Sequence, residues 1–190
     1  IDSMVTPNYE IGMAEYVVQG RRKTYHAFGY VTFQLSRNVP NMILDAKANN
    51  LWGISNLPTR LDQNEKVVLE GGFDKYFKLF VPNGYSRQAR YIFTPDLMAL
   101  LMDKASLFDV EIINNKVYLY IGNVQWGSAG FWRRIDQVVA AISKKVESQT
   151  DRYSDIETIS NNGERMPPLV FRRGQRLRRG PTTVQSIVFA

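Results

Sequence analysis

Alternation of apolar and polar side chains over residues 24–35 constrains the fold of this chain more than any other feature. Val31, Phe33 and Leu35 are separated by polar residues, and a period of two places alternate side chains on opposite faces of a strand. An earlier run, residues 9–19, is rich in tyrosine, valine and small residues, and a short polar break separates it from the alternating run. The two runs together predict a long antiparallel hairpin with one buried face.

Two later segments carry the signals of amphipathic helices. Thr94-Pro95-Asp96 suits a helix start, because a threonine hydroxyl can accept an orphan N–H, proline fits the first turn, and aspartate complements the positive helix end. This helix is predicted to end near Lys104, with three leucines facing the core: Leu97, Leu100 and Leu101. A second helix is predicted over about 129–148 from an apolar stripe at helical spacing: Ile135, Val138, Val139, Ile142 and Val146.

Other apolar runs predict further strands. Residues 42–44 and 66–70 each indicate one, and 73–81 indicates a strand or a strand that follows a turn. Asn114-Asn115 predicts a tight hairpin between 107–113 and 116–121, because asparagine tolerates left-handed backbone angles. Residues 48–63 are predicted to be a loop that is pinned to the core by Trp52, Ile54 and Leu57.

This order of elements predicts the fold class. Strands that adjoin in sequence, with two helices between and after them, favour an α+β fold: an antiparallel-rich sheet with two amphipathic helices packed on one face. Of 190 residues, 44% are apolar and 12% aromatic, which is enough for one sizeable core. We expect one globular domain over 1–153 and a basic C-terminal extension over 154–190.

The positive charge of the chain is concentrated in that extension. Six of the 24 basic residues and no acid follow Glu164, and the remaining 18 bases are matched by 18 acids. The globular part is therefore neutral, which is unlike a fold that binds a phosphate backbone across its face. The extension suits either a solvated linker or a segment attracted to an anionic surface, with these candidate residues: Arg172, Arg173, Arg176, Arg178 and Arg179.

No catalytic, cofactor or metal site is predicted. The chain has no cysteine and one histidine, so thiolate chemistry and multi-histidine metal sites are excluded. It has no phosphate-binding loop, dinucleotide fingerprint or nucleophile elbow. His26 lies in a strand pattern close to three basic residues, where positive charge disfavours a protonated ring. We therefore expect a packed or exposed histidine and not a catalytic base.

Carboxylates in the second half of the chain are the remaining candidates for catalytic residues. Asp103, Asp109 and Glu111 are close in sequence, and paired carboxylates serve hydrolysis or cation binding. Asp109 and Glu111 share one strand face, which we expect to be solvated. Ser143-Lys144 is adjacent only in sequence, and neighbours on a helix do not face each other.

Two aromatic groups have both a binding and a packing interpretation. Phe73, Tyr76, Phe77 and Phe80 alternate with lysines, and 85–91 extends this composition, which would suit base stacking on single-stranded nucleic acid. Packing is favoured, because half of a strand's side chains point inward. A second aromatic cluster lies near the start of the second predicted helix: Trp126, Phe131 and Trp132. It could form a partner patch or a membrane-interface rim, but packing on the core is favoured.

Three stretches also carry a resemblance: Phe73–Phe77, Ala89–Leu101 and Phe108–Ile112. They resemble a bacterial domain family of unknown function, whose members are uncharacterised membrane proteins with hydrophobic helices before a soluble domain. The likeness covers about 70–122, and more loosely 30–150, and the matching residues are a helix cap, core leucines and strand aromatics. It implies a membrane-anchored context and no particular catalytic residue.

These observations predict a non-enzymatic interaction or ligand-sensing domain of a membrane-anchored bacterial protein. The chain opens with Ile1 and not with methionine, so we expect it to be part of a longer protein whose anchor lies upstream, with this domain on the cytoplasmic side. No apolar run approaches the ~18 residues that cross a bilayer, so the given chain is expected to be soluble. The expected partners are an unidentified protein and an anionic lipid surface at the tail. The alternative is a nucleic-acid-binding protein that uses the tail and the Lys/Arg–aromatic stretch.

Overall fold

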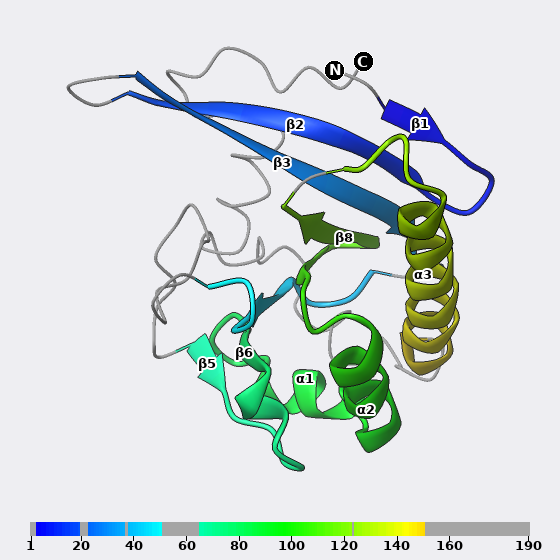
Figure 1. Ribbon diagram of the computed structural model, residues 1–190. Coiled ribbons are helices and arrows are strands. Elements are labelled where there is room, and N and C mark those ends of the chain that lie inside the picture. Colours follow the sequence, from blue (N-terminus) through cyan, green and yellow to red (C-terminus); the bar gives the residue numbers. More distant parts are fainter. Residues whose placement is uncertain (1–2, 20–22, 37, 51–64, 123, 151–190) are drawn as a thin grey trace.

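The computed structural model describes residues 3–19, 23–36, 38–50, 65–122 and 124–150 (Figure 1). Within these residues, eight strands form one antiparallel sheet in the order β1-β2-β3-β8-β7-β4-β6-β5. The strands are β1 (Ser3–Val5), β2 (Glu10–Gln19), β3 (Lys23–Gln34), β4 (Met42–Ala46), β5 (Lys66–Val67), β6 (Phe77–Phe80), β7 (Asp109–Ile113) and β8 (Lys116–Ile121). The helices are α1 (Ser86–Ile92), α2 (Pro95–Lys104) and α3 (Ala129–Thr150), with a short 3-10 turn, η2 (Phe73–Lys75). The predicted α+β class is confirmed.

The helices cover one face of the sheet. Across neighbouring strands, Val31 pairs with Leu119, and Leu119 pairs with Val110, so these side chains share that face. They belong to the main core together with buried residues from all three helices, such as Ile92, Leu101 and Ile142. In Figure 1, α3 and α2 lie next to each other on this side of the molecule. The stripe of α3 is buried as its spacing predicted.

Both predicted hairpins are present. β2 and β3 pair from Glu10 opposite Thr32 to Gln19 opposite Lys23, and they form the long ribbon that reaches beyond β8 in Figure 1. β7 and β8 are joined at Asn114, whose φ of 55° is the left-handed conformation predicted there. The buried Asn41 accepts a hydrogen bond at Oδ1 from the Asn114 amide, at 2.8 Å, and so supports the turn.

The structure corrects several local predictions. Residues 73–81 form a 3-10 turn before a strand, which was one of the two interpretations, and the strand predicted at 66–70 is limited to Lys66–Val67. Helix α1 was not predicted. Thr94 occupies the N-cap position of α2 as expected, but its hydroxyl makes no capping hydrogen bond. Residues 51–64, with the predicted anchors Trp52, Ile54 and Leu57, lie outside the described residues.

Candidate interaction face

The face of the sheet opposite the helices carries the best candidate site. Tyr30 pairs with Tyr120 and Tyr120 pairs with Asp109, so these side chains lie on one face. Ile43 pairs with Glu111, so Ile43 and Asp45, two residues further along β4, lie on this face as well. We call this surface the acidic–aromatic face and define it by six residues: Tyr30, Asp45, Asp109, Glu111, Tyr118 and Tyr120. Within the described residues, the apolar cluster on this face contains sheet residues only, and no helix residue.

The three carboxylates of this face are buried. The exposed fractions are 1% for Asp45, 3% for Asp109 and 0% for Glu111. The prediction that Asp109 and Glu111 are solvated is therefore wrong. Alternation shows which side chains share a face, but it does not show whether that face is covered. Both residues lie on β7, which has β8 on one side and β4 on the other.

Each buried carboxylate has a donor or a cation beside it. The Tyr120 hydroxyl donates to Glu111 Oε2 at 2.6 Å, and the Ala46 amide donates to Asp109 Oδ1 at 2.8 Å. Lys78 Nζ lies 3.7 Å from Asp45 Oδ2. A buried charge is tolerated only when hydrogen bonds and opposite charge replace its lost water. These contacts are therefore part of what keeps the face folded.

Aromatic rings lie among the carboxylates. Tyr118 and Tyr120 are stacked, with centroids 6.2 Å apart and planes at 11°, and Phe28 meets Tyr120 edge-on at 5.7 Å. The Tyr30 hydroxyl donates to Glu10 Oε1 at 2.8 Å. Burial raises the pKa of Tyr30 far above its ordinary value, and the hydrogen bond to Glu10 and the charges of Glu10 and Tyr118 add to that rise.

This combination of groups suits a guanidinium ion. A planar guanidinium can donate two parallel hydrogen bonds to a carboxylate and can also stack on a tyrosine ring. The described residues hold no group of three or more histidine, cysteine or acidic side chains arranged to bind a metal ion.

The structure does not bring the candidate catalytic residues on the helices to this face. Asp103 lies on α2, on the helix side of the sheet, and it is exposed and 2.9 Å from Lys104 Nζ. Ser143 and Lys144 lie on α3, on the same helix side. His26 lies on β3 opposite Tyr16. Asp103 is thus separated from Asp109 and Glu111 despite its proximity in sequence.

The aromatic stretch before α1 is mostly core. Phe73, Phe77 and Phe80 are 1–3% exposed, whereas Tyr76 is 44% exposed. Phe73 and Phe77 stack on each other with centroids 5.0 Å apart. The packing interpretation is confirmed for these three residues, and of the four aromatics only Tyr76 offers an exposed ring.

The tryptophan cluster at the start of α3 also packs on the core. Trp126, Phe131 and Trp132 are partly buried against the main core. Trp132 Nε1 donates to the Trp126 carbonyl at 2.9 Å, and the two indole rings are 5.6 Å apart. This confirms the prediction of a cluster at the helix start.

The sequence analysis missed one residue of the face and predicted other binding residues that the structure does not describe. Asp45 was missed, and its signal was an acid inside the otherwise apolar run Met42–Ala46. The predicted anionic-surface residues Arg172, Arg173, Arg176, Arg178 and Arg179 lie outside the described residues. The proposal that they form a binding segment therefore rests on their sequence.

Comparisons with models of protein families, with curated proteins and with solved structures found no match for this chain. No helix in the described part of the chain is both long enough and apolar enough to cross a bilayer.

Proposed function

We propose that this chain is an interaction domain that binds an arginine-rich protein segment on its acidic–aromatic face. The observation that carries the proposal is the burial of Asp45, Asp109 and Glu111 beside tyrosines, on the sheet face opposite the helices.

Arginine fits this face better than lysine does. The stacked rings of Tyr118 and Tyr120 offer a flat surface, and a guanidinium is planar and more weakly hydrated than an ammonium ion. The carboxylates of Asp109 and Glu111 lie on the same strand face, and a forked donor is the geometry that pairs best with a carboxylate. An ammonium ion would gain the charge attraction without the stacking or the second hydrogen bond.

Nucleic acid is the less favoured partner. Of the rings that would have stacked on bases, Phe73, Phe77 and Phe80 are buried, whereas Tyr76 and Tyr91 are exposed. The acidic–aromatic face would repel phosphates, because its charges are carboxylates. The geometry therefore supports a cationic protein segment and not a nucleic acid.

The proposal includes the location expected from the resemblance. We place the domain at the cell membrane, on the cytoplasmic side, through an upstream anchor. An interaction domain suits that setting, because it would recruit or release a partner near the membrane. Retention of the natural protein in the membrane fraction after salt and alkaline washes tests the anchor.

The binding proposal is tested with a labelled peptide that copies residues 165–180, added to a full-length chain in which all six arginines after Glu164 are replaced by glutamine. We expect saturable binding that weakens with salt, and weaker binding of the matched peptide with lysine for arginine. Asp109→Asn with Glu111→Gln should abolish the binding, and Asp103→Asn, on the opposite side of the sheet, should leave it unchanged. No binding to the glutamine chain at low salt contradicts the proposed function.

A further inference from the structure

We infer that Asn83, in the turn between β6 and α1, is a modification site at which the folded chain undergoes spontaneous deamidation. Water is the co-reactant, and the asparagine becomes an aspartyl or an isoaspartyl residue. The reaction does not involve the acidic–aromatic face, so this inference goes beyond the proposed function and is tested separately from it.

The two residues at the centre of the turn supply the reacting groups. Asn83 is followed directly by Gly84, and deamidation begins when the backbone nitrogen of the next residue attacks the asparagine side chain. Glycine has no Cβ to crowd this approach. Both residues are exposed, so water and hydroxide reach the reacting atoms.

The conformation of the turn leaves this nitrogen accessible. Gly84 has a φ of 90°, a left-handed conformation that glycine adopts without strain. A Cβ at Gly84 would meet nothing within 4 Å, so open space surrounds the residue. The Tyr85 amide closes the turn by donating to the Pro82 carbonyl at 3.1 Å. The hydrogen bond of the turn therefore uses the nitrogen that follows Gly84 and not the Gly84 nitrogen itself.

The reaction balances as the hydrolysis of an amide. The Gly84 nitrogen gives its proton to hydroxide and forms a bond to Asn83 Cγ. The bond from Cγ to Nδ2 breaks, and Nδ2 takes up a proton and leaves as ammonia. Water then opens the resulting succinimide ring. Opening at Cγ gives aspartate, whereas opening at the main-chain carbonyl gives isoaspartate, whose main chain runs through Cγ.

Both products change the surface where α1 begins. Each replaces a neutral amide by a carboxylate, next to a helix whose first turn contains no acidic residue. The isoaspartyl product also lengthens the main chain by one C–C bond, about 1.5 Å. This extra length lies between Val81 and Ala89, which are 1% and 0% exposed, so it alters the connection between two parts of the core.

Asn114 is the control within the same chain, because the fold holds its backbone. The next residue, Asn115, carries a side chain, and the Asn114 amide donates to Asn41 Oδ1 at 2.8 Å. A residue held in this way reacts through local opening of the structure. Trypsin separates the two positions, since cleavage after lysine and arginine releases residues 79–87 and 105–116 as different peptides.

The experiment incubates the full-length chain at pH 8 and at pH 9, both folded and in urea, and follows the mass of each tryptic peptide. Asn83 is the one amide side chain in peptide 79–87, so a change from the mass of an amide to that of a carboxylic acid reports its conversion. The second Asn-Gly pair, Asn162-Gly163, falls in another peptide. Labelling by an isoaspartate methyltransferase detects the isoaspartyl product.

We expect Asn83 to convert at similar rates in the folded and unfolded chains, whereas Asn114 should convert more slowly when the chain is folded. Conversion of Asn83 should be about tenfold faster at pH 9 than at pH 8, because the deprotonated nitrogen becomes tenfold more populated. Asn83→Gln should lose the mass change, since its ring would have six members and forms more slowly. Circular dichroism confirms that each chain is folded. If peptide 79–87 keeps its mass in the folded chain but not in urea, or if folded Asn83 converts no faster than folded Asn114, the inference is overturned.

Discussion

Gly12 has no side chain, and this leaves room for the ring of Tyr30 on the neighbouring strand. A Cβ at this residue would lie 2.7 Å from the Tyr30 hydroxyl oxygen and 2.9 Å from its ring carbons. The ring therefore lies over the glycine, and its hydroxyl reaches Glu10. We expect Gly12→Ala to lower the free energy of unfolding by about 1–3 kcal/mol, because the ring must leave its place.

Urea denaturation measures this loss. Gly127→Ala is the matched control, because a Cβ there would meet nothing within 4 Å. In a Tyr30→Leu background the cost of Gly12→Ala should shrink, since the clashing ring is gone. An unchanged cost in that background would show that Tyr30 is not the cause.

Two buried tyrosine hydroxyls predict how the chain responds to alkali. Burial raises the pKa of Tyr9 to about 12, and its hydrogen bond to Asp136 and the negative charge of Asp136 add to the rise. The pKa of Tyr30 is raised as well. An unfolded tyrosine has a pKa of about 10, so the unfolded chain releases these protons first. The stability from each group is thus fully present below about pH 10 and is lost as the pH rises through the folded-state pKa.

Thermal or urea unfolding between pH 9 and 12 tests this expectation. Each proton that is held only by the folded chain contributes a slope of up to about 1.4 kcal/mol per pH unit. Tyr9→Phe should reduce the alkaline loss, because it removes the hydroxyl whose proton the folded chain holds. The same alkaline slope in the natural and Tyr9→Phe chains would contradict the assignment.

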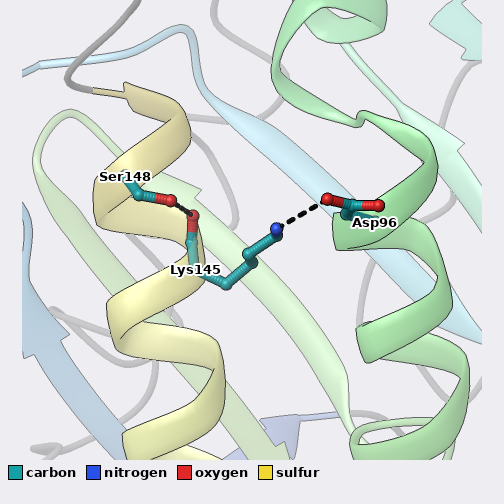
Figure 2. Close-up of polar contacts among 3 residues, drawn as sticks. All are labelled: Asp96, Lys145 and Ser148. Atoms are coloured by element: carbon teal, nitrogen blue, oxygen red, sulfur yellow. Dashed lines mark hydrogen bonds and ion pairs between the residues drawn. The ribbon is translucent and has the colours of Figure 1, made fainter.

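At the scale of elements, α3 is held by its apolar stripe and not by its ion pair with α2. Lys145 Nζ lies 3.0 Å from Asp96 Oδ2, and the Lys145 carbonyl accepts a hydrogen bond from Ser148 (Figure 2). The Asp96 side chain is 79% exposed, and exposed pairs contribute about 0–1 kcal/mol. Ile142 is fully buried, and truncation of such a side chain to alanine costs about 2–5 kcal/mol.

Lys145→Ala should therefore change the free energy of unfolding by less than about 1 kcal/mol. Ile142→Ala on the same helix should lower it by about 2–5 kcal/mol. Urea denaturation of both variants, with and without 0.5 M salt, gives the comparison. A larger loss for Lys145→Ala than for Ile142→Ala would show that the ion pair dominates the packing of α3.

The elements that the sequence predicted correctly are those whose signals are local. The alternation in β3 and the apolar stripe of α3 show directly which side chains are buried. Asn114 predicts its turn because asparagine tolerates the left-handed backbone angle that the turn needs. Helix α1 was missed because its seven residues bury only Ala89 and Ile92, too few for a recognisable period. The burial of Asp109 and Glu111 was not predictable, because alternation along β7 shows that the two side chains share a face but not whether that face is covered. Coverage of a sheet face depends on contacts between segments far apart in the chain.

At the scale of the whole molecule, the excess positive charge lies in the arginines after Glu164, which are the expected contact with an anionic surface. Each arginine near an anionic lipid surface contributes on the order of 1 kcal/mol of attraction, and the tail holds six. We therefore expect the natural chain to sediment with vesicles that contain phosphatidylserine, and the chain with the six arginines replaced by glutamine to remain in the supernatant.

Neutral vesicles are the control for this experiment, and neither chain should sediment with them. Sedimentation of the natural chain with the anionic vesicles should weaken as salt is raised, because salt screens the attraction between exposed charges. Equal sedimentation of the natural and glutamine chains at low salt would show that these arginines do not hold the chain to lipid.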